Sequence, residues 1–260
     1  MRPAKRGVRG VTVLHLTFAV DLLKQLRVIA VVVSGLAVLL FAAAGPGTRL
    51  GLWDFRTGLG LLKWGAYAGG AGVLLALAAL VATRPRAGER VMLVVALVLA
   101  GGTVFVPWRA VQRARAVPPI HDITTDTQDP PAFVAVLPRR VGAANAAVYG
   151  GDSVATLQHR GYPDLRALRL GVAPQAAYGR ALAAARGMGW EVVAADSAAG
   201  RIEATATTRW FGFKDDVVVR LRPDGDGTRV DVRSVSRVGQ SDVGTNAERI
   251  RAYLARLARA

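Results

Sequence analysis

Cysteine is absent from the 260-residue chain. Disulfide bonds, thiolate nucleophiles and cysteine-ligated zinc or iron–sulfur centres are therefore excluded. Any folded domain in the chain must be stabilised by its core alone, which a domain of roughly 140 residues can provide.

Acidic residues are scarce in the first 117 residues, which carry Asp21, Asp54 and Glu89 against 15 Lys+Arg. Residues 118–260 carry 19 Lys+Arg against 15 acids. Three quarters of the net charge (+12 of +16) thus flanks hydrophobic runs, where it orients a chain in a membrane and contacts anionic lipids. A nucleic-acid-binding domain would carry the basic residues on its own surface. Membrane lipids, and not nucleic acid, are the predicted partner.

Charged residues are also absent from three apolar runs, residues 28–44, 65–82 and 91–108. Each run is close to the ~20 residues that cross a hydrocarbon core of ~30 Å. A helix of a soluble bundle would show a polar stripe, whereas Ser34 is the only polar residue in 28–41. The sequence therefore predicts three transmembrane helices within a membrane domain of residues 1–117.

Basic residues around these runs predict the orientation of the chain. With the N-terminus in the cytoplasm, nine basic residues lie inside: Arg2, Lys5, Arg6, Arg9, Lys24, Arg27, Arg84, Arg86 and Arg90. Six lie outside: Arg49, Arg56, Lys63, Arg109, Arg113 and Arg115. This bias predicts a multi-pass protein of the inner (cytoplasmic) membrane with a cytoplasmic N-terminus and an extracytoplasmic C-terminal domain.

Residues 118–260 are predicted to form a soluble α+β domain. Loops around short helices are expected up to residue 173, where Pro, Gly, Asp and Thr are frequent. A helix is then predicted over 174–186, because Pro174 favours the first helical position and two glycines follow.

Alternating apolar residues next predict four consecutive strands, at 190–195, 201–209, 216–222 and 228–237. A final helix is expected over 246–259, with Thr245 and Glu248 as a capping box. The expected fold is an antiparallel four-stranded sheet with packed helices on one face and a wet opposite face, as in helix-grip folds.

Four segments of this half resemble a known family. They are HDITTDTQDPPAF at 121–133, GYPDL at 161–165, GRIEATATTRWFGFKDDVVVRLRP at 200–223 and VDVRSVSRVGQSDVGTNAERIRAYLARL at 230–257. Over residues 118–258 the chain resembles the domain-of-unknown-function family 1499, and its N-terminal helices resemble those of the membrane-anchored members. The resemblance implies a fold unit and an envelope setting, but no established activity and no catalytic residues.

Potential metal ligands or bases cluster at the start of the domain, at His121, Asp122, Asp126 and Asp129. Their spacing fits no metal template well, and such Asp–Thr clusters also form Asx-turns. Gly151-Asp152-Ser153 resembles the nucleophile block of one lipase and esterase family, but no histidine follows His159 to serve as its base. No catalytic residue, metal or cofactor is therefore predicted, and a ligand role for the first cluster stays the alternative.

Residues 210–216 join two predicted strands and combine three aromatic rings with Asp215 and Asp216. The rings would line a pocket, and two close carboxylates would repel so that one holds a proton; the structural alternative is a strand bend at Gly212. Polar residues before the last helix would bind an anion or serve as ordinary caps. The predicted ligand-binding residues are Trp210, Phe213, Asp215, Asp216, Arg237 and Asp242.

The predicted function is a non-enzymatic envelope protein whose outer domain binds a protein partner or an amphipathic ligand near the membrane. The alternative is an enzyme acting on a lipid or cell-wall precursor through Asp215 and Asp216, or through His121 with Asp122. An enzyme requires these groups to converge in a deep polar pocket, whereas a binding module requires an apolar groove or an open sheet face.

Overall fold

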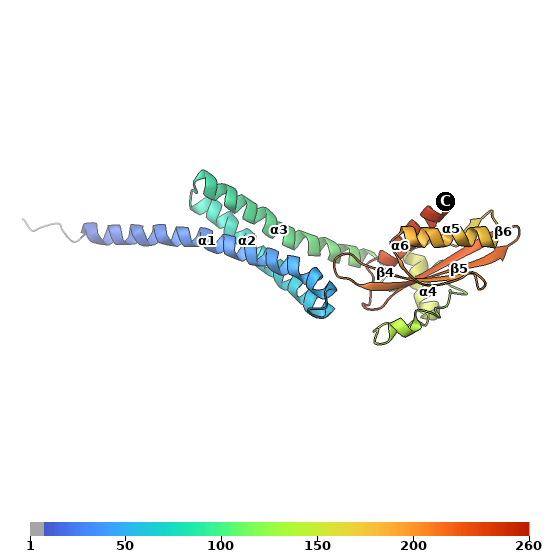
Figure 1. Ribbon diagram of the computed structural model, residues 1–260. Helices are drawn as coiled ribbons and strands as arrows, with labels where there is room; N and C mark the ends of the chain where they lie inside the picture. Colours follow the sequence, from blue (N-terminus) through green and yellow to red (C-terminus); the bar gives the residue numbers. More distant parts are fainter. Residues whose placement is uncertain (1–7, 260) are drawn as a thin grey trace, which may run out of the picture. The chain divides into compact units, whose positions relative to one another are not determined.

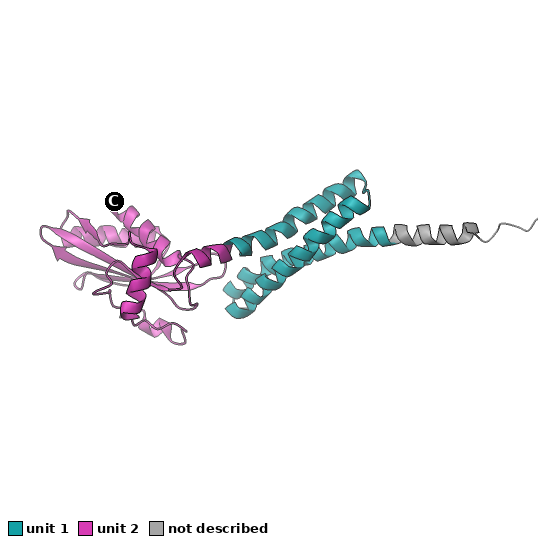
Figure 2. Cartoon of the chain, turned by 180° about the vertical axis from the view of Figure 1, so that it is seen from behind, with its two compact units in different colours: residues 1–109 teal, residues 110–260 magenta. Residues whose placement is uncertain are grey.

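A computed structural model describes the backbone of residues 8–259 and the side chains of residues 22–259. The chain divides into two compact units, residues 1–109 and residues 110–260 (Figure 2). Helix α3 contributes residues to both units, because it continues to Ala116.

Three long helices make up the first unit: α1 (Val8–Arg49), α2 (Phe55–Ala82) and α3 (Ala87–Ala116) (Figure 1). The segments Leu22–Arg49, Phe55–Ala82 and Ala87–Ala116 are long and apolar enough to cross a membrane. Large apolar side chains are exposed along all three helices. The three apolar helices predicted from the sequence are present, which is consistent with a multi-pass membrane protein.

Small residues in α2 allow the helices to approach closely. A Cβ on Gly69 would collide with Thr103, and one on Gly72 would lie 2.7 Å from Ser34 Oγ. Arg27 forms an ion pair of 2.5 Å with Glu89 and donates to the carbonyl oxygen of Thr83 at 2.9 Å. The α2–α3 connection and Arg27 therefore lie on one side of the unit.

The second unit contains a six-stranded antiparallel sheet in the order β1-β6-β5-β4-β3, with β2 also paired to β6. The strands are β1 (Asp122–Thr124), β2 (Leu168–Leu170), β3 (Glu191–Asp196), β4 (Arg201–Thr207), β5 (Lys214–Asp224) and β6 (Gly227–Ser236). The helices are a 3-10 turn, η1 (Leu137–Arg140), and the α-helices α4 (Gly151–Gly161), α5 (Pro174–Gly187) and α6 (Thr245–Ala258). The predicted number of four strands is wrong, because β1 and β2 have three residues each and are too short to show alternation.

One face of the sheet packs against α5 and α6, which lie together on one side of it (Figure 1). This helix face consists of Ile202, Ala204, Val217, Val219, Val230 and Val232. Above it, the Trp190 ring stacks on Tyr253 at a centroid distance of 5.0 Å, and the Tyr253 hydroxyl donates to the carbonyl oxygen of Ala181 at 2.9 Å. The helix face and its two helices form the main hydrophobic core of the domain.

The opposite face is also buried, so the predicted wet face is wrong. The buried part of this ionic face consists of Glu203, Thr205, Asp216, Val218, Asp231, Arg233 and Val235. Partly exposed arginines, Arg220, Arg222 and Arg229, continue it. Residues 125–150, here the covering segment, pack over it through Phe133 and Val136. Alternation places polar residues on this face as predicted, but many of them are buried beneath the covering segment.

Candidate functional site at one end of the sheet

One end of the sheet brings together all six predicted ligand-binding residues. There β5 begins with Lys214 opposite Thr207, the last residue of β4, and its next residue, Asp215, lies opposite Ser236 at the end of β6. The carbonyl oxygen of His121 accepts from Ser236 N at 3.0 Å, and that of Ile120 accepts from Asp242 N at 3.2 Å. Because residues 117–121 follow α3, this end of the sheet is called the exit end.

Asp216 is completely buried on the ionic face. Its carboxylate accepts hydrogen bonds from Thr205 Oγ1 at 2.7 Å, Arg140 Nη1 at 2.5 Å and the Arg237 guanidinium at 2.8 and 2.9 Å. Burial by itself raises the pKa of Asp216, but hydrogen bonds from Arg237, Thr205 and Arg140 outweigh burial, and the pKa lies below its ordinary value. Asp216 and Arg237 therefore attach the covering segment to the sheet.

Asp215 lies on the other face of the sheet, because adjacent strand residues alternate. It is buried and forms an ion pair of 2.5 Å with Arg249 of α6. Arg249 Nη1 also donates a hydrogen bond to Ser234 Oγ at 3.0 Å. Asp215 and Asp216 thus share neither a pocket nor a proton.

Asp242 caps the last helix. Its carboxylate accepts from the backbone N–H groups of Gly244 at 2.9 Å and Asn246 at 2.6 Å. Burial raises the pKa of Asp242, and these two hydrogen bonds only partly oppose that effect. The capping box predicted at Thr245 and Glu248 is wrong, because Thr245 is already helical, the cap residue is Gly244, and the side-chain acceptor comes from Asp242 two residues earlier.

The two predicted aromatic residues belong to a turn between β4 and β5, residues 208–213, here the aromatic hairpin. Its ends are closed by Thr208 N donating to the carbonyl oxygen of Phe213 at 2.8 Å. The Phe211 and Phe213 rings stack with centroids 5.1 Å apart, and Trp210 lies 5.7 Å from Phe211. Trp210 is 36% exposed, and none of the three rings belongs to a hydrophobic core cluster of residues 22–259.

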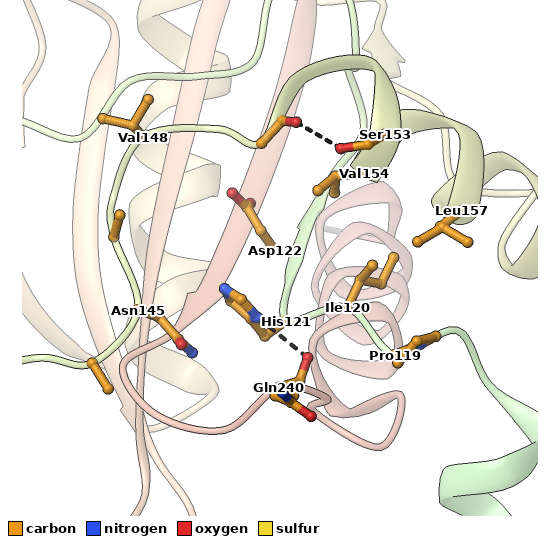
Figure 3. Close-up of a pocket in the computed structure, with 13 residues that line it drawn as sticks. Pro119, Ile120, His121, Asp122, Asn145, Val148, Ser153, Val154, Leu157 and Gln240 are labelled. Atoms are coloured by element: carbon orange, nitrogen blue, oxygen red, sulfur yellow. Dashed lines mark hydrogen bonds between the residues drawn. The ribbon is translucent and has the colours of Figure 1, made fainter.

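An open pocket of about 650 Å³ lies at the exit end, and none of the six predicted ligand-binding residues lines it (Figure 3). Its lining comes from Pro119, Ile120, His121, Asp122, Ala144, Asn145, Ala146, Val148, Gly150, Ser153, Val154, Leu157 and Gln240. We call this cavity the exit pocket. The sequence offered His121 with Asp122 as one cluster and Ser153 as a separate candidate. Their meeting in one cavity was not predicted, because loops without periodicity join them.

Figure 3 shows the hydrogen bonds that His121 and Ser153 form with other residues of the exit pocket. His121 Nδ1 lies 3.3 Å from the carbonyl oxygen of Gln240, so this nitrogen is assigned the proton and Nε2 is left as an acceptor. Ser153 Oγ donates to the carbonyl oxygen of Gly150 at 3.0 Å. The Asp122 carboxylate binds Arg233 through two hydrogen bonds of 2.9 and 2.7 Å. Neither Ser153 nor Asp122 is thus bonded to His121.

The acidic residues that the sequence offered as metal ligands form ion pairs with arginines. Buried Arg233 binds Asp122 and lies over the rings of Phe133 at 5.1 Å and Tyr149 at 5.4 Å. Further along the ionic face, three arginines and three acids form one network: Arg220, Arg222, Arg229, Asp126, Asp129 and Asp231. Among the described residues, no group of three His, Cys, Asp or Glu side chains is arranged to hold a metal ion.

Fold and site together define an α+β domain that follows three helices long and apolar enough to cross a membrane, with a pocket lined partly by the residues after the last of these helices. Residues 122–257 match the family described as protein of unknown function (DUF1499). The match covers 136 of the 260 residues, so the chain belongs to this family, and the resemblance predicted from the sequence is confirmed. No curated protein and no solved structure matches the chain.

Proposed function

We propose that the C-terminal domain binds an amphipathic ligand in the exit pocket, close to the membrane that holds the apolar helices. This proposal rests on the position in the sequence of the residues that form one wall of the pocket. Pro119, Ile120 and His121 line the pocket and follow the end of α3 at Ala116 by three to five residues. A ligand in this pocket would be bound at the part of the domain nearest in sequence to the membrane.

The lining suits a molecule with one polar and one apolar part. Val148, Val154 and Leu157 provide apolar surface, whereas His121 and Asn145 provide polar atoms. His121 Nε2 would accept a hydrogen bond from a ligand hydroxyl or amide. A volume of about 650 Å³ lies within the range of small-molecule sites, and the open side would let a longer apolar chain extend beyond the pocket.

The ion pairs that the acidic residues form with arginines favour a binding function over a catalytic one. A general base or nucleophile must reach the reacting atom, and catalytic groups must be within hydrogen-bond reach of one another. Asp122, Asp215 and Asp216 are each bound to arginine, and Ser153 donates to a backbone carbonyl group. The alternative, an enzyme that acts on a lipid or cell-wall precursor, has less support from these contacts.

The proposal includes the cellular setting. The chain would lie in the inner membrane, with its N-terminus in the cytoplasm and the domain on the outer side, in the cell envelope. The excess of basic residues, nine against six, supports this orientation. A reporter that is active only after export, fused after Ala260, is expected to be active. Activity only from a cytoplasmic reporter at the same position would reverse the proposed orientation.

Photocrosslinking at matched positions tests the ligand site. Val148 and Val141 both belong to the covering segment and are 83% and 88% exposed, but only Val148 lines the exit pocket. A photoreactive residue at position 148 of the full chain in native membranes is expected to capture an amphipathic molecule, identified by mass spectrometry. The same residue at position 141 is the control. Equal labelling at both positions would contradict a ligand in the pocket.

A further inference from the structure

The covering segment supplies part of the lining of the exit pocket, namely Ala144, Asn145, Ala146, Val148 and Gly150. We call residues 144–150 the second wall. This stretch forms neither helix nor strand, and every second residue in it is exposed. Its position therefore depends on a few attachments to the rest of the domain. One of them is the carbonyl oxygen of Ala147, which accepts a hydrogen bond from Arg233 Nη2 at 2.7 Å.

Asn145 is the second attachment, and it lines the pocket (Figure 3). Its backbone N–H donates to the carbonyl oxygen of Arg237 at 3.0 Å, and its own carbonyl oxygen accepts from Arg140 Nη2 at 2.9 Å. Its side-chain Nδ2 donates to the carbonyl oxygens of Ser236 at 3.1 Å and Gly239 at 2.9 Å. Because these two carbonyl groups use both Nδ2 hydrogens, Oδ1 is the atom that the side chain offers to a ligand, as an acceptor.

One buried carboxylate connects the two arginines that hold the backbone of Asn145. Asp216 accepts from Arg140 Nη1 at 2.5 Å and from Arg237 Nε and Nη2 at 2.9 and 2.8 Å. Asp216 is completely buried, and the Arg140 side chain is 5% exposed. Charged groups in such surroundings keep their geometry only while their partners are present. Asp216 does not line the pocket, but its two partners fix a residue that does.

We propose that Asp216 is a positioning residue of the exit pocket. Through Arg140 and Arg237 it holds Asn145 so that Oδ1 accepts a hydrogen bond from a hydroxyl or amide group of the ligand. His121 Nε2 provides a further acceptor in the same pocket. This inference rests on the proposed function and deepens it, because it assigns the ligand a polar part that donates hydrogen bonds.

Hydrogen exchange of the full chain in detergent tests the positioning without a ligand. Asp216→Asn replaces one acceptor oxygen by a donor, and the amides of residues 143–146 are expected to exchange several-fold faster than in the wild-type chain. Asp231→Asn is the matched control, because Asp231 is also completely buried and bound to arginines but contacts the covering segment at Thr125 and not at Asn145. Amides of α5 report any general loss of stability. Equal exchange at 143–146 in both variants would overturn the inference.

Competition between two lipids tests the consequence for binding. 1-Monooleoylglycerol and methyl oleate carry the same acyl chain, but only the first has hydroxyl groups to donate. Native mass spectrometry of the full chain with equal amounts of both is expected to show a several-fold preference for 1-monooleoylglycerol. Asp216→Asn should lose this preference and Asp231→Asn should keep it. Asn145→Ala, which truncates a side chain at the surface of the pocket, should lose it without unfolding the domain.

The outcomes separate this inference from the proposed function. A wild-type chain that binds both lipids equally, or a preference that persists in Asp216→Asn and Asn145→Ala, would overturn the positioning role and leave a ligand in the pocket. A wild-type chain that binds neither lipid would contradict the proposed function and this inference with it.

Discussion

Both faces of the sheet contain buried residues, but apolar packing dominates on the helix face and ion pairs dominate on the ionic face. On the helix face, Val and Ile side chains pack against α5 and α6, and the buried Asp215–Arg249 ion pair lies at the exit end of that face. On the ionic face, Glu203, Asp216, Asp231 and Arg233 are all at most 3% exposed. Strict alternation of apolar and polar residues along a strand therefore does not by itself imply that the polar face of the sheet is exposed to solvent.

Contacts on the ionic face run in both directions between the strands and the covering segment. The Glu203 carboxylate accepts from the backbone N–H groups of Val134, Ala135 and Val136, each at 3.0 Å. In the opposite direction, Arg140 of the covering segment binds Asp216 of β5. Buried ion pairs add little stability compared with apolar packing, but breaking one is costly. They therefore specify which segment covers the face.

Among the substitutions that compare the two faces, Glu203→Ala should cause the largest loss in the free energy of unfolding. The substitution leaves three backbone N–H groups without their acceptor under a covered face, so we expect a loss of about 3–5 kcal/mol in the free energy of unfolding. Pulse proteolysis of the detergent-solubilised full chain in urea measures it. Glu203→Gln keeps one oxygen acceptor and should lose less. A loss below about 1 kcal/mol for Ala would mean that the covering segment is held by other contacts.

Ile250→Ala tests the helix face. Ile250 lies on α6 and is completely buried in the main core, so its truncation is expected to cost about 2–4 kcal/mol. Because only apolar contacts are lost, the cost should not change between pH 7 and acidic pH. The same urea titration at two pH values measures this. A cost that changes with pH would show that the two faces are energetically coupled.

Acid pH should weaken the ionic face selectively. The folded-state pKa of Asp216 is below its ordinary value, so its carboxylate stabilises the fold above the unfolded pKa of about 3.9 and this stabilisation is lost as pH falls through the folded value. Asp216→Asn should be less stable than the wild-type chain at pH 7 and should lose less stability on acidification. Parallel stability curves for the two chains would contradict this assignment.

Removal of the membrane unit should have the smallest effect on the stability of the C-terminal domain. The predicted domain, residues 118–260, contains the whole sheet, both of its faces and the helices that pack on it. We expect this fragment to unfold cooperatively in urea, with a stability that chelators do not alter. A fragment with native secondary structure but no cooperative transition would show that the domain needs the residues before it.

Composition and periodicity predict much of this molecule. The apolar helices follow from runs without charge, and β3–β6 follow from alternation in residues 190–237. The cover on the ionic face could not be predicted, because its contacts are remote in sequence: Arg233 and Asp122 are 111 positions apart. The exit pocket was missed for the same reason, since it is built from loops whose positions depend on these pairs.

The most direct test of the central claim, a ligand in the exit pocket, is native mass spectrometry of the full chain and two matched variants. Val148→Trp fills the pocket opening, whereas Val141→Trp adds the same ring to an exposed position outside it. We expect a bound amphipathic molecule on the wild-type chain and on Val141→Trp. It should be absent from Val148→Trp, although the stability of that variant should be unchanged. The same bound mass on all three chains would contradict it.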